Sequence, residues 1–425
     1  MIPIQIGTKS VYTEYITLAL RRAGFYSRIS DEYDMSVQEA VKNFQQSRGL
    51  EADGIVGERT YSALLPYLEG YVRIIAGEGE TVQSIADKYG TTTQAVRIAN
   101  PDIDMQNLSG TVVTVPFGFD VVPSDVNYTY YLTEIISRGL GARYPFIKVY
   151  SIGLSLMGKD LTCLEMGNGK TEVFFNGTHH ANEWITTPLL FKYTEDYAKA
   201  YTEDARIEGI SARKLFEEKK LYVVPLVNPD GMDLVNGGMA DTKYLELTKA
   251  ISADYPSIPY PDGWKANIAG TDPNLNYPAG WLNARDIKFA QGYVSPAPRD
   301  FVGIAPLSAP ESRAVHDFTL DKNFALTLSY HTQGEVIYWK YLDFEPANSR
   351  AIGEELSRVS GYTLELTPSA SGYAGYKDWF ILNYNRPGYT IEVGTGQNPL
   401  PISQFDEIYR ANKPLMTTAL NLAVY

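Results

Sequence analysis

The sequence predicts a multidomain protein with a small three-helix bundle, a small βααβ domain, and a large α/β domain whose mixed twisted sheet is flanked by helices. The chain has 425 residues, which exceeds the size of one ordinary hydrophobic core. Short helical patterns dominate its beginning, whereas strand-like runs alternate with helical runs from residue 119 onward. We therefore expect domains at residues 1–69, 70–118 and 119–425.

The first domain is expected to be the helical bundle. TEYITLALRRAGF and SVQEAVKNFQQSRGL place apolar residues at helical spacing and stop near a glycine, and Ser36 is expected to cap the second helix. The turn DGIVG precedes a third helix that begins near Thr60. The run AVKNFQQSRGLEADGIVGERTYSAL resembles the bacterial peptidoglycan-binding three-helix module. This resemblance implies that the first domain binds peptidoglycan.

The second domain is expected to follow a βααβ order. A short strand precedes GEGET, the helices SIADKYG and TTTQAVRIAN follow, and the strand TVVTVP closes the domain. GEGE alone could suggest a phosphate-binding loop, but the third glycine of that fingerprint is missing. The segments GET, IADKYG, ANP and VTVP together resemble a LysM module. This resemblance implies binding to the N-acetylglucosamine of glycan strands.

Polar side chains follow the strand-like runs of the third domain. His179, His180 and Glu183 come directly after TEVFFNG, His331 follows NFALTLSY, and Glu392 lies in GYTIEVG. Because ligands gather at the carboxyl ends of strands in an α/β sheet, we expect these groups to meet at one edge of the sheet.

His180 and Glu183 are three residues apart, so a helical turn would let both side chains share a cation. His331 would complete a set of two histidines and one glutamate, which suits zinc and leaves one position for water. An HxxE pair is a weak signal alone, and adjacent histidines are more often structural. We interpret His179 as structural or as part of the substrate rim. The weight of the zinc prediction comes from several motifs that occur in order.

Five motifs resemble the zinc carboxypeptidase family: HHANEW, VNPDG, GWKANIAGTDPNLNY, LSYHTQG and DWFILNYNRPGYTIEVG. They occur in the family's order and cover about residues 125–420. The resemblance implies that His180, Glu183 and His331 bind one zinc ion, which is the ligand set of carboxypeptidase A.

The resemblance also implies roles for residues near the metal. Asp272, in GTDPN, would orient the first zinc histidine through its other ring nitrogen. Glu392 would take a proton from the attacking water and later give it to the leaving amine. Lys265 stands where the family has an arginine that stabilises the oxyanion, and lysine keeps the charge without the planar fork. Tyr373 best matches a mobile tyrosine that contacts the substrate amide, with Tyr376 as the alternative.

One departure from the family concerns substrate binding. The family carries Asn-Arg where this chain has Asn274 and Leu275, and that pair grips the terminal carboxylate of the substrate. The missing arginine predicts cleavage inside a chain or in a branched peptide, although Arg386 could supply a cation. Lys377, at the base of the expected specificity pocket, could pair with a carboxylate of a diamino acid such as diaminopimelate, or be a solvated surface lysine.

Composition and charge exclude other classes of protein. The net charge of −13 makes the chain a poor partner for nucleic acid or an anionic membrane. No apolar run is long enough for a membrane span. The single cysteine, Cys163, excludes an internal disulfide and a cysteine-based zinc site, and its context DLTCLEMG predicts a buried strand residue.

Together, these features predict a bacterial zinc peptidase whose partners are peptidoglycan glycan strands and stem peptides. The architecture resembles the γ-D-glutamyl-L-diamino acid endopeptidase I group, which implies cleavage between γ-D-glutamate and meso-diaminopimelate or lysine. The alternatives are a conventional metallocarboxypeptidase that trims C-terminal residues and a non-catalytic wall-binding protein. The N-terminus lacks a secretory signal pattern, so we expect either a cytoplasmic, sporulation-linked location or association with the cell wall.

Overall fold

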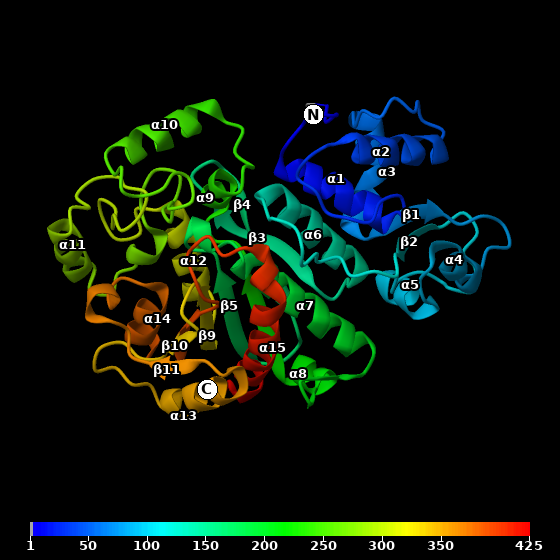
Figure 1. Ribbon diagram of the computed structural model, residues 1–425. Coiled ribbons are helices and arrows are strands. Elements are labelled where there is room, and N and C mark those ends of the chain that lie inside the picture. Colours follow the sequence, from blue (N-terminus) through cyan, green and yellow to red (C-terminus); the bar gives the residue numbers. More distant parts are fainter. Residues whose placement is uncertain (1–2) are drawn as a thin grey trace. The chain divides into compact units, whose positions relative to one another are not determined.

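A computed structural model describes residues 3–425 of the chain (Figure 1). These residues form two compact units. The first unit runs as far as Asn127 and includes Tyr131–Ile147, whereas the second comprises Tyr128–Tyr130 and Lys148–Tyr425. The boundaries predicted after residues 69 and 118 both fall within the first unit and remain predictions. No helix of the described chain is both long enough and apolar enough to cross a membrane.

The first unit begins with the three predicted helices: α1 (Val11–Arg22), α2 (Met35–Ser47) and α3 (Glu58–Glu69). Their contact faces are apolar, and Leu18, Val41 and Leu64 are fully buried. Asp34 rather than Ser36 caps α2, because the Asp34 carboxylate accepts a hydrogen bond from the backbone N–H of Val37 at 2.9 Å. The predicted cap was therefore two residues late.

The βααβ order of the next segment is confirmed: β1 (Tyr71–Ile75), α4 (Val82–Tyr89), α5 (Thr93–Ala99) and β2 (Val112–Pro116). The two strands pair antiparallel, and the helices cover a small core that includes Ile85 and Val96. The last helix, α6 (Tyr130–Arg143), belongs to this unit except for its first residue. Gly139 lets α6 pack closely, because a Cβ there would lie 2.3 Å from the Glu69 carbonyl oxygen.

The second unit is built on an eight-stranded sheet with the strand order β11-β10-β12-β9-β5-β8-β4-β3. Its strands are β3 (Lys148–Leu154), β4 (Asp160–Met166), β5 (Thr171–Gly177), β8 (Lys219–Val224), β9 (Phe324–His331), β10 (Val336–Tyr338), β11 (Thr363–Glu365) and β12 (Gly388–Glu392). Strands β12, β9, β5 and β8 run parallel, and antiparallel pairs flank them on both sides. The predicted mixed sheet is confirmed. Cys163 is buried in β4, as predicted.

Helices and short segments connect these strands. The helices are α7 (Thr186–Thr202), α8 (Ala212–Glu218), α9 (Pro229–Val235), α10 (Thr242–Ala253), α11 (Trp281–Ala290), α12 (Pro310–Leu320), α13 (Ser349–Ser360), α14 (Tyr376–Tyr384) and α15 (Phe405–Leu422). The short 3₁₀ turns are η1 (Ala181–Glu183), η2 (Pro273–Leu275), η3 (Ser369–Ser371) and η4 (Ile402–Gln404). A separate hairpin pairs β6 (Arg206–Ile207) with β7 (Ile210–Ser211).

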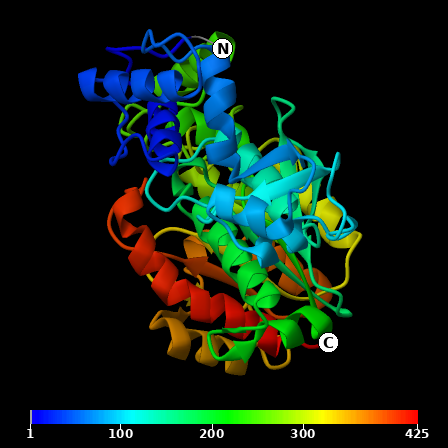
Figure 2. The ribbon, with the colours of Figure 1, turned by 90° about the vertical axis from the view of Figure 1, so that its right-hand side faces the viewer.

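Helices cover both faces of the large sheet (Figure 1). On one face Phe174 contacts Phe318 of α12 and Tyr376 of α14, with ring centroids 5.6 and 5.8 Å apart. On the other face Phe175 contacts Tyr193 of α7 at 6.0 Å. Neighbouring strand residues reach different layers because successive side chains point to opposite faces. Figure 2 shows α13, in orange, beside α15, in red, and α15 also contacts α7.

Candidate metal centre and active site

The site begins where β5 and β9 end. These strands are parallel neighbours, and Gly177 at the end of β5 pairs with Tyr330 of β9. His331 is the last residue of β9, while the chain beyond β5 turns through His180 into η1, which carries Glu183. Because parallel strands end at the same edge of a sheet, side chains 151 positions apart in the sequence meet there.

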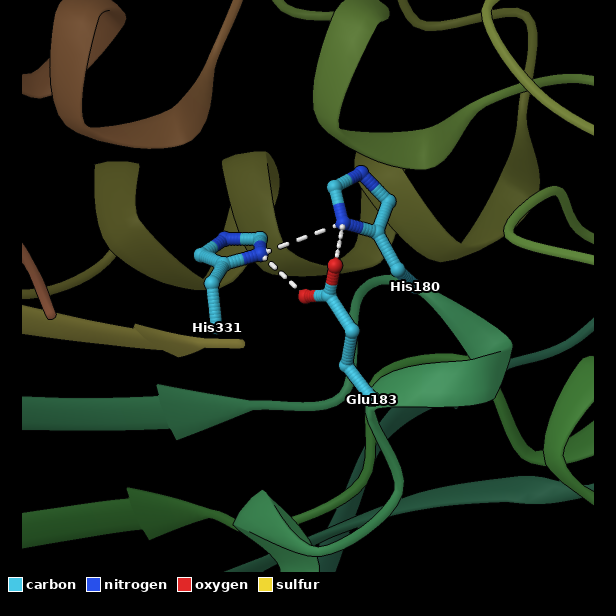
Figure 3. A group of neighbouring side chains, drawn as sticks. All are labelled: His180, Glu183 and His331. Carbon is cyan, nitrogen blue, oxygen red and sulfur yellow. Dashed lines mark hydrogen bonds and ion pairs between the residues drawn. The ribbon is translucent and has the colours of Figure 1, made fainter. Parts of the chain in front are cut away.

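The three predicted ligands point toward one another (Figure 3). His180 Nδ1 lies 3.2 Å from His331 Nδ1. The Glu183 carboxylate contacts both rings, with Oε1 3.0 Å from His180 Nδ1 and Oε2 2.9 Å from His331 Nδ1. The ligand atoms all lie within 4.8 Å of one another, and no other cluster of this kind occurs within residues 3–425.

This donor set fits one zinc ion. Tetrahedral zinc binds imidazole nitrogen and carboxylate oxygen at about 2.0–2.1 Å, which separates neighbouring ligand atoms by roughly 3.3 Å. The separations of 2.9, 3.0 and 3.2 Å are close to that value. Two histidines and one glutamate leave a fourth position for water or substrate. His180, Glu183 and His331 therefore form a site for one zinc ion.

Two residues hold the histidine rings from behind. Asp272 Oδ1 lies 3.1 Å from His180 Nε2 and also accepts a hydrogen bond from the backbone N–H of Asn274 at 3.0 Å. The Asn274 side-chain nitrogen lies 3.2 Å from His331 Nε2, and its Oδ1 accepts from the backbone N–H of Tyr376 at 3.0 Å. Asp272 can accept the Nε2 proton of His180, which turns the Nδ1 atom of His180 toward the metal position. The Asn274 amide nitrogen is a donor, so Asn274, predicted to bind substrate, contacts the His331 ring without offering it an acceptor.

The charges at the site favour ionised carboxylates. Burial lowers the pKa of His180, but Glu183 and Asp272 outweigh burial and raise this pKa to about 9. Burial raises the pKa of Glu183 and Asp272, yet the nearby His180 and Lys265 cations hold the pKa of both carboxyls below their ordinary values. Burial lowers the pKa of His331. The two ionised carboxylates thus flank a protonated His180, and a metal ion that binds His180 displaces its Nδ1 proton.

Glu392 and Lys265 lie next to the ligand group. Glu392 ends β12 and is the register partner of His331 in the sheet. Lys265 Nζ donates a hydrogen bond to Glu183 Oε1 at 2.7 Å. Burial, reinforced by the charge of Glu183, raises the pKa of Glu392 to about 8. Burial lowers the pKa of Lys265, but Glu183 outweighs it and the pKa is raised. A carboxyl able to exchange a proton near neutral pH and a fixed cation thus adjoin the metal position.

Two cavities lie side by side here, and the smaller one contains the ligand group. The smaller, of about 210 Å³, is lined by the three ligands together with Asn274, Leu275 and Lys377, among others. The larger, of about 870 Å³, adjoins it. The two share four lining residues: Lys265, Arg299, Tyr338 and Glu392. The cleft therefore continues past the metal position instead of ending there.

Lys377 lines the smaller cavity but is only 3% exposed, so its interpretation as a solvated surface lysine is wrong. Its Nζ donates to Asp378 Oδ1 at 2.6 Å, to the carbonyl oxygen of Lys340 at 2.8 Å and to Thr367 Oγ1 at 3.3 Å. A lysine ammonium group has three N–H donors, and all three have acceptors here. Lys377 has no donor left over for a substrate carboxylate.

Three other residues considered for the site do not line these two cavities. Tyr373 packs against a small apolar cluster, and Tyr376 is fully buried in the core. Arg386 donates a hydrogen bond to the carbonyl oxygen of Phe324 at 2.7 Å. Phe324 is the first residue of β9, whereas the zinc ligand His331 is the last. An eight-residue strand separates its ends by roughly 20 Å. This placement corrects the suggestion that Arg386 replaces the missing carboxylate-binding arginine.

Sequence reasoning missed two residues of the cleft, Arg299 and Tyr338. Arg299 lies in the long segment 237–305, where frequent Gly, Pro, Asn and Asp residues leave little periodic signal. Tyr338 lies on the short strand β10, which follows the last zinc ligand. The sequence marked each of them only as a charged or aromatic residue near a recognised motif. Such residues are too common for that position alone to predict a place in the active site.

An eight-stranded mixed sheet with a two-histidine, one-glutamate zinc site at the carboxyl ends of its central strands defines an α/β zinc carboxypeptidase. A family model described as zinc carboxypeptidase matches residues 134–414, which is more than half of the chain. The chain therefore belongs to the zinc carboxypeptidase family. A second family model, described as a peptidoglycan binding domain, matches residues 16–64.

Particular relatives narrow the comparison. The chain is 43% identical over 290 residues to gamma-D-glutamyl-L-diamino acid endopeptidase 1 of Lysinibacillus sphaericus, covering 68% of this chain and 71% of that protein. It is 23% identical over 261 residues to carboxypeptidase B of Rattus norvegicus, covering 57% of each. The crystal structure of thrombin activatable fibrinolysis inhibitor matches with a TM-score of 0.57 at 16% identity, covering 83% of this chain and 98% of that chain. This last likeness supports the fold alone.

Proposed function

We propose that the protein is a zinc peptidase that hydrolyses peptidoglycan stem peptides between γ-D-glutamate and the diamino acid, which is meso-diaminopimelate or lysine. The observation that carries the proposal is the continuous cleft, in which Lys265, Arg299 and Glu392 border both cavities. A substrate can extend on both sides of the reacting bond, as cleavage inside a chain requires. The similarity to a γ-D-glutamyl-L-diamino acid endopeptidase supports the same bond.

The residue after Asn274 supports the proposal independently. Leu275 lines the smaller cavity, where the family's arginine would bind the terminal carboxylate of a substrate. A leucine side chain offers a carboxylate neither charge nor a hydrogen-bond donor. A free C-terminal carboxylate is therefore not the feature that this cavity is built to recognise.

The chain's own residues can perform the proton transfers of hydrolysis. When bound, zinc lowers the pKa of a water molecule and polarises the scissile carbonyl. Glu392 accepts a proton from the attacking water and delivers it to the diamino acid nitrogen as the C–N bond breaks. Lys265 Nζ, 2.7 Å from a ligand oxygen, supplies a cation for the charge that develops on the carbonyl oxygen. The role predicted for Tyr373 would require movement of the loop that carries it.

We extend the proposal to the N-terminal unit. The peptidoglycan binding domain match supports wall binding by residues 1–69, and the βααβ order supports a LysM module at residues 70–118. Both would direct the enzyme to peptidoglycan. We favour association with the cell wall, and the sporulation-linked cytoplasmic location remains the alternative. Immunofluorescence of vegetative and sporulating cells would separate these locations.

The test uses the tetrapeptide L-Ala-γ-D-Glu-meso-diaminopimelyl-D-Ala, with and without a chelator, and identifies the products by mass. The proposal expects L-Ala-D-Glu and diaminopimelyl-D-Ala only in the zinc-containing sample. Release of D-Ala alone would instead indicate a conventional carboxypeptidase. Failure to cleave this peptide or any unbranched peptide, together with binding to purified walls, would indicate a non-catalytic wall-binding protein.

A further inference from the structure

The cations around the smaller cavity differ in how far their donors are already used. Lys265 contacts the zinc ligand Glu183, and the three donors of Lys377 all have acceptors. Lys288 pairs with Asp300 at 2.6 Å and is almost fully buried. Arg299 remains, and it lines both cavities.

The Nε atom of Arg299 is hydrogen-bonded, whereas its terminal guanidinium nitrogens are available. Its Nε donates to Asp300 Oδ2 at 2.6 Å, and its side chain is 40% exposed. Within residues 3–425 no hydrogen bond from its two terminal nitrogens is found. A guanidinium presents five N–H donors in a planar fork, so those nitrogens can still bind a carboxylate with two parallel hydrogen bonds.

The loop that carries Arg299 is tied to the metal centre. The backbone N–H of Asp300 donates to Asp272 Oδ2 at 3.3 Å, and Asp272 contacts His180. The Asp300 carboxylate also pairs with Lys288. These contacts fix the start of the Arg299 side chain relative to the zinc ligands, as precise substrate recognition requires.

The sizes of the cavities indicate which part of the substrate each receives. The smaller cavity suits the diamino acid of the leaving group, and the larger one suits the glutamyl residue with the chain that precedes it. In a γ-linked glutamate, three carbon atoms separate the scissile carbonyl from the free α-carboxylate. That carboxylate would lie beside the reacting bond on the side of the larger cavity, which Arg299 also borders.

We propose that Arg299 binds the free α-carboxylate of the γ-linked glutamyl residue and so determines specificity on the acyl side of the bond. The inference rests on the proposed function. It places the carboxylate-binding group on the acyl side of the scissile bond, whereas Leu275 lines the cavity on the leaving-group side. It predicts that stem peptides whose glutamyl α-carboxylate has been amidated are poor substrates, because an uncharged carboxamide loses the charge-assisted pair.

The first test compares two substrates that differ only in having the glutamyl α-carboxylate free or amidated. For the unmodified enzyme kcat/KM should be about 10- to 100-fold higher with the free carboxylate, which is the size expected for losing one charged hydrogen-bonded pair. In Arg299→Gln that ratio should fall close to one, mainly through loss of activity on the carboxylate substrate. Arg299→Lys should restore part of the ratio, because it keeps the charge without the fork.

The matched control is Arg285→Gln, because the partly exposed Arg285 also pairs with the aspartate that follows it, Asp286. This variant should leave the ratio unchanged. An equal fall of kcat/KM for both substrates in Arg299→Gln would show a merely structural role and overturn the inference. The inference would also be overturned if Arg299→Gln changed the discrimination between free and amidated diaminopimelate carboxylates and left the discrimination at the glutamyl carboxylate unchanged.

A binding experiment separates this inference from the proposed function. Calorimetry with the Glu392→Gln variant measures the Kd of both peptides without turnover, in the presence and absence of the Arg299→Gln change. If Arg299→Gln weakens binding of the free-carboxylate peptide and not of the amidated peptide, the role of Arg299 is supported. This holds even if the unmodified enzyme fails to cleave the bond, a result that would defeat only the proposed function. Equal affinity for both peptides would overturn the inference while leaving cleavage intact.

Discussion

At the residue scale, the site depends on which nitrogen of each histidine is turned toward the metal position. His180 presents Nδ1 because the Asp272 carboxylate lies at its Nε2 atom, and the Nδ1 atom of His331 lies 3.2 Å from that of His180. The aspartate was predicted from its motif, whereas Asn274 was expected to meet substrate. The short segment GTDPN therefore contacts both imidazole ligands, but only its aspartate offers a ring nitrogen an acceptor.

Asp272→Asn is expected to weaken zinc binding by about 10- to 100-fold, because the amide keeps the shape of the side chain but loses the charge that orients His180. Competition with a chromophoric chelator measures the change. Asp254→Asn, at an exposed helix end, is the control and should bind zinc like the unmodified protein. An unchanged zinc affinity in Asp272→Asn would contradict the prediction.

Glu392→Gln is expected to lower kcat by about a hundred- to ten-thousand-fold, since a carboxamide cannot carry the proton from water to the leaving amine. Zinc content should stay at one ion per chain, because Glu392 is not among the three ligands. Steady-state kinetics and metal analysis on one preparation test both statements. Glu365→Gln, on the exposed edge strand β11, should leave both unchanged. Turnover near the normal rate would remove Glu392 from the mechanism.

At the element scale, the short turn η1 is held in place by the start of α9. Asn228 caps this helix by accepting from Gly231 N–H at 3.0 Å, and its amide donates to the carbonyl oxygens of His179 and Ala266 at 3.1 and 2.9 Å. A Cβ at Gly231 would lie 2.7 Å from the Cβ of Ala181 in η1. The VNPDG motif thus contributes packing that positions two zinc ligands, without contacting the metal itself.

Gly231→Ala is therefore expected to lower the free energy of unfolding by about 1–3 kcal/mol through overpacking, and to weaken zinc binding by displacing η1. Urea unfolding followed by circular dichroism measures the first effect, and chelator competition measures the second. Gly372→Ala is the control, because the nearest atom to its Cβ would be 3.4 Å away and its φ is negative. Normal stability together with normal zinc affinity in Gly231→Ala would refute this account of η1.

At the scale of the whole molecule, the predicted helical bundle and βααβ segment form one compact unit with α6. Aromatic rings join the first two parts. Tyr67 at the end of α3 stacks on Phe117 just after β2, with centroids 5.1 Å apart, and Phe117 stacks on Phe119 at 5.4 Å. Arg22 of α1 lies over Phe119 at 4.8 Å. Such a continuous stack limits independent motion of the two parts.

Phe117→Ala is expected to destabilise this first unit by about 2 kcal/mol, because it removes three ring contacts and partly buried apolar area. Calorimetry should show a lower Tm for one transition and little change in the transition of the second unit. Phe289→Ala, at a partly exposed position of the second unit, should leave the first transition unchanged. A single transition shifted as a whole, or no shift at all, would contradict the prediction.

The sequence by itself determined the helical character of the first segment, the βααβ order of the second, the α/β class of the large domain and the three zinc ligands. These features are local: a strand with an alternating or continuous apolar pattern ends in a polar residue, and such ends meet at one sheet edge by a general rule. His180, Glu183 and His331, 151 positions apart at the extremes, were assigned together because the motifs that carry them also occur in the order of the zinc carboxypeptidase family.

Only the tertiary structure decided which other polar residues face the cleft. Arg299 enters it from an irregular loop, Lys377 is buried with its donors satisfied, and Arg386 lies at the opposite end of β9. Sequence spacing cannot assign these positions, because long loops carry no periodicity that fixes the direction of a side chain. The metal site follows from the strands, whereas the substrate contacts depend on how the loops pack above them.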